Sequence, residues 1–507
     1  MRGRVDPERE AGDPIKLLLI LPILSLLASC NQQNKSGTRE IAVIPKPQSV
    51  AYDRGDFILS HATRLKFDQA DIRIKEIAGQ ISQVLWTSVL PDRGSGVIGL
   101  GIDDRADIQP AGYRLQVRRN KIKVMAREPA GLFYGIQTLK QLIPADGSGK
   151  IPCMDMTDFP AFGWRGLMLD CSRTFLPKEY ILKSIDRLAA IKMNVLHLHL
   201  TDDQGWRIEI KKYPELTRIS SKFDPRYPGE VNGFYTQDDI REIVAYAAKN
   251  FITVVPEIEM PGHSTEIFAA YPELSCSGKM SVIFPFFKGP AVTEDILCAG
   301  NDQVFAFMEG VLSEVMALFT SEYIHVGGDE APKTAWIKCP KCQSRIKAEG
   351  LKDEAELQSY LIRRIEKFIN SKGRKLIGWD EILEGGLAEN AAVMSWRGEQ
   401  GGIEAARQGH SVVMSPTSHC YFDYSYETTS TEKVYSYDPV PKELTGDPSK
   451  CILGAQANMW THIARTEPAI DAQIFPRLYA LAEVLWTNPA VRDYADLERR
   501  ISVRTLP

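Results

Sequence analysis

The sequence lacks a surplus of charge of either sign, and it lacks a phosphate-binding loop. Its 61 Lys and Arg and 65 Asp and Glu are interspersed along 507 residues and give a net charge of -4. This balance argues against a nucleic-acid partner. No glycine-rich loop with nucleotide-binding spacing precedes a helical stretch, and "GVIGLGI" near Val97 does not have that pattern. With only eight histidines, a histidine-rich metal centre is also disfavoured, and we expect no cofactor.

The N-terminus lacks an apolar run long enough to cross a bilayer. The run "LLLILPILSLL", residues 17–27, is too short and contains a proline. It follows a basic stretch and precedes "LLASC", so residues 1–30 have the pattern of an export signal. "LLASC" resembles a bacterial lipoprotein processing site, which implies lipidation of Cys30 and a polar tether over residues 31–40. An ordinary signal peptide is the alternative. We expect an exported protein, periplasmic or on the cell surface, with a lipid anchor in a bacterial membrane.

Nine cysteines are present, and in an exported chain cysteines can pair. Cys276 and Cys298 bracket a segment that a disulfide could staple. Cys339 and Cys342 form a single C-x-x-C, "CPKC", which supplies only half of the four ligands that a structural zinc site normally uses. A local disulfide or free thiols is therefore expected, with no metal site.

Residues 41–155 mix extended and helical patterns. The stretch "GYRLQVRRNKIKVMA" alternates like a hairpin that turns at Arg119 and Asn120. The stretch "PAGLFYGIQTLKQLI" that follows has apolar residues at helical spacing. A small α+β domain is predicted over this range.

From residue 156 to residue 507, short β-rich runs recur with amphipathic helical stretches between most of them. Their apolar beginnings suit strands that are buried on both faces. Eight such runs predict a (β/α)₈ TIM barrel, a fold of the α/β class. The runs begin at Trp164, Val195, Ile252, Tyr323, Lys375, Ala392, Ser411 and Ile452.

The carboxyl ends of barrel strands form the active-site face of such a fold. Here they provide carboxylates, one arginine and several aromatic side chains, which suit a sugar with its apolar face and rim of hydroxyls. The candidate residues are Asp170, Arg173, Asp202, Asp203, Glu257 to His263, Asp329, Glu330, Trp379 to Glu381, Trp396, Tyr421, Asp423 and Trp460.

Asp329 and Glu330 are adjacent in "YIHVGGDEAPKTAW". Most glycosidases hold two carboxyls on opposite sides of the scissile bond, about 5 Å or ~6.5–9.5 Å apart. Neighbours on one strand end are poorly placed to do so. The alternative is a substrate that supplies its own nucleophile, a 2-acetamido oxygen, while one acid holds the acetamido N–H and the other transfers protons.

The motifs "HVGGDE", "DCSR", "HLHLTDDQGWRIEI", "PEIEMPGH", "GWDE", "SWRG" and "YFDY" together resemble glycoside hydrolase family 20, the β-N-acetylhexosaminidases. The resemblance extends from "IPKPQSV" near Ile44 to about Trp486 and covers both domains. It implies an exo-acting, retaining enzyme that removes terminal β-linked GlcNAc or GalNAc through an oxazolinium intermediate. Glycans ending in N-acetylhexosamine, or chito-oligosaccharides, are the substrates that it implies.

The resemblance also implies roles for single residues. Glu330 would be the general acid and base, and Asp329 would orient the acetamido group. Tyr421 would bind the acetamido carbonyl, and Arg173 and Asp423 would bind ring hydroxyls. Trp379, Trp396 and Trp460 would form the walls of the sugar pocket. Asp202 and His263 would form a polar network near Glu330 that sets its pKa and orientation.

Two features depart from the family pattern. "MWTHIA" places His462 where many relatives have a glutamate that binds outer sugar hydroxyls, so recognition at C4 and C6 is unassigned. The chain also ends at "RISVRTLP", where relatives usually continue through a final helix, and we expect a shortened last βα unit.

Two other functions stay open. His197 and His199 have the H-x-H spacing of a metal-dependent amidohydrolase or deacetylase on a barrel strand, although packing and hydrogen bonding inside the barrel suits them better. A non-catalytic sugar-binding lipoprotein could use the same fold. Oligomeric state, disulfide connectivity and natural glycan are not predicted.

Overall fold

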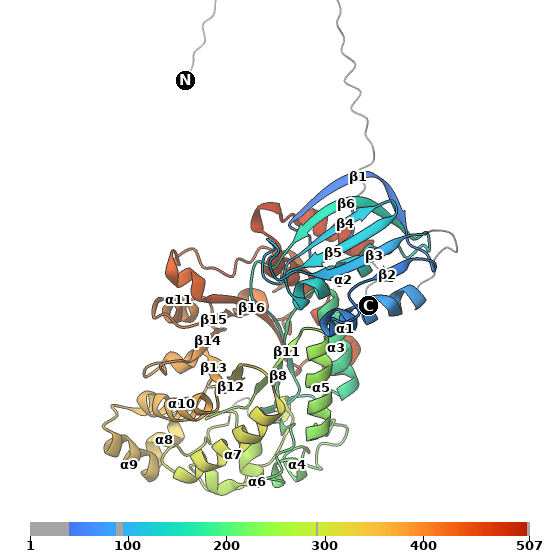
Figure 1. Ribbon diagram of the computed structural model, residues 1–507. Helices are drawn as coiled ribbons and strands as arrows, with labels where there is room; N and C mark the ends of the chain where they lie inside the picture. Colours follow the sequence, from blue (N-terminus) through green and yellow to red (C-terminus); the bar gives the residue numbers. More distant parts are fainter. Residues whose placement is uncertain (1–39, 88–94, 290–292, 504–507) are drawn as a thin grey trace, which may run out of the picture. The chain divides into compact units, whose positions relative to one another are not determined.

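The computed structural model describes residues 40–87, 95–289 and 293–503 (Figure 1). The predicted signal peptide, its Cys30 and residues 31–39 of the tether therefore lie outside the described residues. Within the described part of the chain, no helix is both long and apolar enough to cross a membrane.

The first domain is a six-stranded sheet with two helices. The strand order is β1-β6-β4-β5-β3-β2. The hairpin of β4 and β5 is antiparallel and turns at Arg119 and Asn120, as predicted. The strand β6 continues past residue 155 to Asp158. The elements are β1 (Ser49–Ile58), β2 (Arg64–Lys66), α1 (Ile72–Thr87), β3 (Val97–Ile102), β4 (Tyr113–Arg118), β5 (Lys121–Ala126), α2 (Pro129–Leu142) and β6 (Lys150–Asp158).

The second domain is a closed barrel of eight parallel strands, in the order β11-β12-β13-β14-β15-β16-β7-β8. All eight predicted strands are confirmed, and only two of them begin one residue later than predicted, at Thr253 and Val412. The strands are β7 (Trp164–Asp170), β8 (Val195–His199), β11 (Thr253–Glu257), β12 (Tyr323–His325), β13 (Lys375–Trp379), β14 (Ala392–Ser395), β15 (Val412–Met414) and β16 (Ile452–Met459).

Helices and loop elements lie between the barrel strands. A short antiparallel pair, β9 (Thr201–Asp202) and β10 (Gly205–Trp206), follows β8. The helices are α3 (Lys178–Ala190), α4 (Glu215–Arg218), α5 (Gln237–Lys249), α6 (Thr265–Ala270), α7 (Asp302–Leu318), α8 (Thr334–Lys338), α9 (Pro340–Glu349), α10 (Glu354–Ser371), α11 (Gln400–Arg407), α12 (Thr417–Cys420), α13 (Thr431–Tyr435), α14 (Glu467–Ile474), α15 (Arg477–Trp486) and α16 (Tyr494–Ser502). The single 3-10 turns are η1 (Pro272–Leu274), η2 (Phe286–Lys288), η3 (Asp380–Leu383), η4 (Asp447–Cys451) and η5 (Pro489–Val491).

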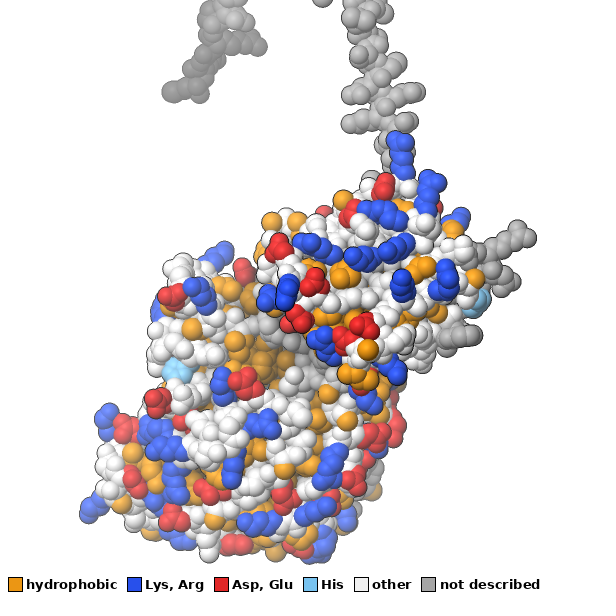
Figure 2. All heavy atoms as spheres, viewed as in Figure 1, with side chains coloured by type: hydrophobic (Ala, Val, Ile, Leu, Met, Phe, Trp, Pro, Cys, Tyr) orange, Lys and Arg blue, Asp and Glu red, His pale blue; other side chains and the backbone are white. Residues whose placement is uncertain are grey.

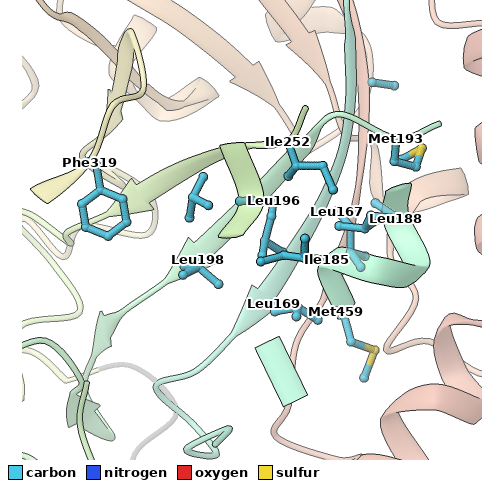
Figure 3. Packing of buried hydrophobic residues seen from close by; sticks show 14 of the residues in the cluster. Leu167, Leu169, Ile185, Leu188, Met193, Leu196, Leu198, Ile252, Phe319 and Met459 are labelled. Atoms are coloured by element: carbon cyan, nitrogen blue, oxygen red, sulfur yellow. The ribbon is translucent and has the colours of Figure 1, made fainter. Parts of the chain in front are cut away.

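Side chains that alternate along the strands build two apolar layers. On the outer side, Leu167 and Leu169 of β7 lie beside Leu196 of β8 and face Ile185 and Leu188 of α3 (Figure 3). Each fully buried side chain of this kind stabilises the fold by ~1.5–3 kcal/mol. A separate inner cluster fills the barrel, and it consists of Trp164, Val195, Val255, Ile377, Trp379, Ala392, Met394 and Val413. The barrel is therefore a packed core that holds the strand ends in place.

A buried ion pair joins the first domain to the barrel. Lys192 Nζ lies 2.8 Å from Asp158 Oδ2, and both side chains are fully buried. The same carboxylate accepts hydrogen bonds from Tyr113 Oη at 2.5 Å and from Trp486 Nε1 at 2.8 Å. Since a buried carboxylate is costly unless its oxygens are paired, this network makes Asp158 a structural link between β6 and the barrel.

The helices after β16 contact the first domain, since Arg500 Nη1 of α16 donates a hydrogen bond of 2.9 Å to Val43 O. Arg500 of α16 donates two hydrogen bonds of 2.7 Å to the carboxylate of Glu483 on α15. The predicted shortening of the last βα unit relative to relatives stays a prediction.

The eight cysteines that the structure describes form no disulfide. Cys276 and Cys298 are not joined, and the same holds for Cys339 and Cys342. Charges of both signs are interspersed over the face of the molecule shown in Figure 2, consistent with the small net charge.

Candidate active site

All of the predicted site residues in the described chain lie at or just beyond the carboxyl ends of barrel strands. This placement follows from the parallel sheet, since every such strand presents its last residues at one rim. Arg173 follows β7, Asp202 lies in β9 after β8, His263 follows β11, Asp329 and Glu330 follow β12, Trp379 ends β13, Trp396 follows β14, Tyr421 and Asp423 follow β15 and α12, and Trp460 follows β16.

A sharp turn after β12 presents the two neighbouring acids. Gly327 and Gly328 have positive φ angles of 65° and 96°. A Cβ on Gly327 would lie 1.7 Å from Glu259 Oε2, so only glycine fits there. Glu330 also has a positive φ, 43°, which is uncommon outside glycine and marks a strained position. Its side chain is 47% exposed, whereas that of Asp329 is 13% exposed.

His263 lies between four carboxylates, one of which is Asp203, with its Oδ2 3.7 Å from His263 Nδ1. Its Nε2 is 3.5 Å from Glu330 Oε2 and 3.6 Å from Asp329 Oδ2. Its Nδ1 is 3.2 Å from Asp202 Oδ1. His263 also has a positive φ, 47°, and the preceding Gly262 lies so close to the next loop that its Cβ would be 3.2 Å from the Cα of Ala331. The loops after β11 and β12 are therefore packed together at the acids.

The charges shift the protonation of this group. Burial lowers the pKa of His263, but Asp202, Asp203 and Glu330 outweigh it and raise the pKa well above its usual value. The interaction with His263 lowers the pKa of Glu330. Burial raises the pKa of Asp329 to about 6. The two adjacent acids thus titrate differently because one is exposed beside a cation and the other is buried.

Asp202 connects His263 with Arg173. Arg173 Nη2 is 2.6 Å from Asp202 Oδ2, and His199 Nε2 is 2.8 Å from the same oxygen. Burial would raise the pKa of Asp202, but Arg173 and His263 outweigh it and lower the pKa far below its usual value. A further residue, Gln204, accepts a hydrogen bond of 3.0 Å from Arg173 Nε. The predicted Arg173, Asp202 and His263 therefore form one connected set.

Glu257, which the sequence placed among the strand ends without a role, is the centre of a buried network inside the barrel. Its Oε1 accepts a hydrogen bond of 2.7 Å from Trp379 Nε1 and lies 2.9 Å from His325 Nδ1. Its Oε2 lies 3.3 Å from His197 Nε2 and contacts His199 Nδ1. His197 Nδ1 is hydrogen-bonded to Gln456 Nε2 at 3.0 Å, and the ring nitrogens of His199 both contact carboxylates, so the H-x-H pair is hydrogen-bonded within the barrel. This arrangement favours a structural network over the amidohydrolase alternative.

Aromatic side chains form one wall. Trp396 and Tyr421 are stacked with their ring centroids 6.1 Å apart. Trp460 lies 6.4 Å from Tyr421 and 6.1 Å from Trp379, measured between ring centroids. Trp396 Nε1 donates a hydrogen bond of 2.8 Å to Glu381 Oε2, and burial, with the nearby Asp329, raises the pKa of Glu381 to about 8. Glu381, the last residue of the "GWDE" motif, therefore fixes the orientation of Trp396.

A second edge of the site brings the predicted Arg173 and Asp423 and the unassigned His462 together with Phe286, which the sequence did not predict. The ring of His462 lies 4.9 Å from the ring of Phe286, between centroids, and His462 Nε2 is 3.9 Å from Asp423 Oδ2. The guanidinium carbon of Arg173 lies 5.9 Å from the same Phe286 ring. Burial raises the pKa of Asp423 to about 7. No sequence signal located Phe286, because it lies in an irregular loop far from any strand end.

Asp329 Oδ1 and Asp423 Oδ1 are among the buried carboxylate oxygens that have no hydrogen-bond partner in the described residues. Buried acceptors without a partner are costly. They suit donors on a bound molecule, such as an amide N–H or a hydroxyl.

Comparison with known proteins agrees with this geometry. The model of "Glycosyl hydrolase family 20, catalytic domain" matches residues 162–489, and "Glycosyl hydrolase family 20, domain 2" matches residues 40–159. A β-hexosaminidase from Porphyromonas gingivalis is 42% identical over 94% of this chain, which spans 65% of that protein's length. A β-hexosaminidase from Vibrio furnissii is 34% identical, over 87% of this chain and 76% of the relative.

A solved structure has the same fold. The crystal structure of a family 20 exo β-N-acetylglucosaminidase from Vibrio harveyi, in complex with N-acetylglucosamine, superposes with a TM-score of 0.80. It is 30% identical in sequence, and the match covers 91% of this chain and 76% of that one. The two family models together span most of the chain, and the chain belongs to glycosyl hydrolase family 20.

Proposed function

We propose that the chain is an exo-acting, retaining β-N-acetylhexosaminidase that removes terminal, non-reducing β-linked GlcNAc or GalNAc by substrate-assisted catalysis. The observation that carries this proposal is the pairing of two adjacent acids with opposite environments. Glu330 is exposed beside His263, and Asp329 is buried with one oxygen unpartnered among the described residues. An exposed carboxyl can reach a leaving-group oxygen, and a buried one can hold an amide N–H.

In the first step, the carbonyl oxygen of the 2-acetamido group attacks C1, and the bond from C1 to the leaving oxygen breaks. Glu330 gives its proton to that oxygen. Asp329 accepts the acetamido N–H and stabilises the positive charge that spreads over the oxazolinium ring. The low exposure of Asp329 strengthens this interaction, because charges attract more strongly away from water.

In the second step, a water molecule attacks C1 from the side of the departed group. Glu330, now a carboxylate, takes the proton of the water, and the bond between C1 and the acetamido oxygen breaks. Two displacements at C1 restore the β configuration. His263 lowers the pKa of Glu330, which keeps the carboxyl ionised for this step, and the proton that the His263 ring itself carries can return to Glu330 for the next cycle.

The remaining residues would bind the sugar. Tyr421, which is stacked on Trp396, would donate to the acetamido carbonyl. Arg173 and Asp423 would bind hydroxyls of the sugar ring. The rings of Trp379 and Trp460 would cover the apolar face of the sugar.

The test is a panel of p-nitrophenyl substrates, β-GlcNAc, β-GalNAc and plain β-glucoside, with the purified wild type before and directly after brief exposure to a chelator. Turnover of the two acetamido sugars alone, unchanged by brief chelation, supports the proposal. Equal turnover of the glucoside contradicts substrate assistance. Immediate loss on chelation supports the amidohydrolase alternative, and tight sugar binding without turnover supports a binding protein.

We propose in addition that the protein is exported and lipid-anchored through Cys30. The "LLASC" pattern supports this proposal. Expression of wild type and Cys30→Ala, with radiolabelled palmitate and fractionation of membranes, tests it. Label and membrane association in the wild type only are expected, and equal fractionation of both proteins would contradict it.

A further inference from the structure

Four cysteines that are far apart in the sequence meet in one place, away from the acids described above. Cys276 follows η1, and Cys298 precedes α7. Cys339 caps the amino end of α9, and Cys342 lies in its first turn. The four sulfur atoms all lie within 4.8 Å of one another. Three of these cysteines are buried and Cys276 is partly buried.

The distances between the sulfurs identify the kind of group that they form. Cys298 Sγ is 3.6 Å from Cys339 Sγ and 3.7 Å from Cys342 Sγ, and Cys276 Sγ is 3.7 Å from Cys342 Sγ. In a tetrahedral zinc site with Zn–S bonds of about 2.3 Å, neighbouring sulfurs are about 3.8 Å apart. A disulfide bond measures only about 2.05 Å. The separations match the edges of a tetrahedron of thiolates.

The backbone around the sulfurs is held firmly. The segments that carry Cys276 and Cys298 pair in an antiparallel bridge between Ser275 and Leu297. Cys276 N donates to Ile296 O at 3.2 Å, and Cys298 N donates to Leu274 O at 2.9 Å. Because side chains alternate between the two faces of such a pair, both cysteine side chains lie on the same face of this short ribbon.

Helix α8 (with Trp336) and the start of α9 pack against that ribbon. Trp336 Nε1 donates a hydrogen bond of 2.9 Å to Leu297 O. A Cβ on Gly300 would lie 2.2 Å from the backbone of Lys341 and 2.5 Å from Cys342 N, so glycine is needed for this approach. The contacts that hold the four sulfurs in their arrangement therefore involve backbone and packing outside the cysteines themselves.

We propose that Cys276, Cys298, Cys339 and Cys342 bind one zinc ion as four thiolates. A tetrahedral site of four thiolates is typical of zinc. Because all four positions are filled by the protein, the ion has no open position for substrate and acts as a structural site. The sequence offered only the C-x-x-C half of this set. The other two ligands, Cys276 and Cys298, lie beside the C-x-x-C pair only in the folded structure.

The position of the four cysteines indicates that the ion would hold two loops of the active site together. Cys276 and Cys298 belong to the long loop between β11 and α7, which also carries His263. Cys339 and Cys342 belong to the connection between β12 and α10, which also carries Asp329 and Glu330. One zinc ion would therefore clamp the two loops whose contact places His263 against Glu330. The metal site does not depend on the reaction proposed above.

Metal analysis of the purified full-length chain, together with thiol counting and peptide mapping, tests this inference. We expect about one zinc ion per chain in the wild type, and its release when a mercurial reagent modifies the thiols. The variants Cys298→Ser and Cys342→Ser should lose most of the zinc. Cys451→Ser, which changes a partly buried cysteine in η4 outside the cluster, is the matched control and should retain it.

Two further measurements keep the test decisive if a serine variant does not fold. Replacement of the metal in the wild type by Co²⁺ should give the absorption bands of a tetrahedral cobalt thiolate complex. Slow removal of zinc should lower the thermal midpoint of unfolding of the wild type, and added zinc should restore it. The wild type is purified with zinc and reductant present. Absence of bound metal from that protein would overturn the proposal, whether the four cysteines are then found as two disulfides or as free thiols.

Discussion

Glu330 Oε2 lies 3.5 Å from His263 Nε2, and both residues hold a positive φ angle. Backbone strain at two residues in contact, on loops from different strands, is maintained only when the surrounding structure stabilises it. The two side chains also shift each other's pKa: the imidazolium lowers the pKa of the carboxyl, and the carboxylates raise the pKa of the imidazole. Glu330 and His263 are therefore expected to bind and release protons as a coupled pair.

Replacement of His263 by Gln should shift the alkaline limb of the kcat/KM profile toward lower pH. In the wild type the pair keeps its proton until His263 titrates, well above its usual pKa. Without the imidazole, Glu330 loses its proton at its own lower pKa. We expect a shift of about one pH unit or more, which corresponds to ~1.4 kcal/mol per unit.

The control for this variant is His410→Gln, because His410 is a partly buried histidine whose Nδ1 contacts Ala391 O, outside the site. Its profile should equal that of the wild type. An unshifted alkaline limb in His263→Gln would show that His263 has only a structural role.

The buried Asp329 should set the acidic limb. Burial raises its pKa to about 6, and the ionised carboxylate accepts the acetamido N–H and stabilises the developing positive charge more strongly than the protonated acid does. As the pH falls through about 6, Asp329 is protonated and kcat/KM should fall. Initial rates with p-nitrophenyl β-GlcNAc across the acidic range, with circular dichroism to verify folding, measure this limb. Constant activity well below this pH would contradict the assignment of Asp329.

Asp329→Asn removes the charge without changing the size of the side chain. The loss of an interaction with developing charge in a site screened from water typically lowers kcat by ~10²–10³-fold. KM should change much less than kcat, because the interaction strengthens in the transition state. A change confined to KM would instead indicate ordinary substrate binding.

His462 is expected to act on binding and not on chemistry. It contacts Phe286 and lies 3.9 Å from Asp423, and no contact joins it to Asp329 or Glu330 among the described residues. His462→Ala should raise KM by roughly 3- to 10-fold, equivalent to about 0.7–1.4 kcal/mol, with kcat nearly unchanged. Comparison of GlcNAc and GalNAc substrates would show whether the effect depends on the C4 hydroxyl. A fall in kcat with constant KM would contradict this role.

Asp158 should be far more important for stability than its neighbour on the same strand. The variant Asp158→Ala removes the carboxylate that the buried Lys192 faces, and breaking a buried pair in this way typically costs ~3–5 kcal/mol. Asp155→Ala is the matched control, because Asp155 pairs with Arg118 at the exposed surface, where such pairs add little. Urea denaturation followed by fluorescence compares the two. Equal midpoints for both variants would show that the Asp158 carboxylate is not needed to hold Lys192 in the interior.

The barrel could be predicted from the sequence because each of its strands has a pattern that is visible within a short stretch of residues. Each strand is a short apolar run that ends in polar or aromatic residues, and parallel strands align those ends at one rim. Arg173, Glu330 and Trp460 could therefore be assigned to the same face from the order and spacing of these runs. The hairpin at Arg119 and Asn120 was predictable for the same reason.

Contacts between distant segments were not predictable. Phe286 lies in an irregular loop, and nothing in its neighbourhood indicates that it reaches His462. Glu257 was visible at a strand end, but its position at the centre of a histidine network depends on the closure of the barrel. The cluster of Cys276 and Cys298 with the C-x-x-C motif depends on how two long loops fold over one another, which no spacing rule describes.

The measurement that tests the central claim most directly is kcat/KM for p-nitrophenyl β-glycosides whose 2-acetamido group carries none, one, two or three fluorine atoms. Fluorine withdraws electrons from the carbonyl oxygen that acts as the nucleophile, while the rest of the substrate is unchanged. Our account predicts that kcat/KM falls steeply with each fluorine atom. A rate that is independent of fluorination would contradict it, because the acetamido oxygen would then take no part in breaking the bond.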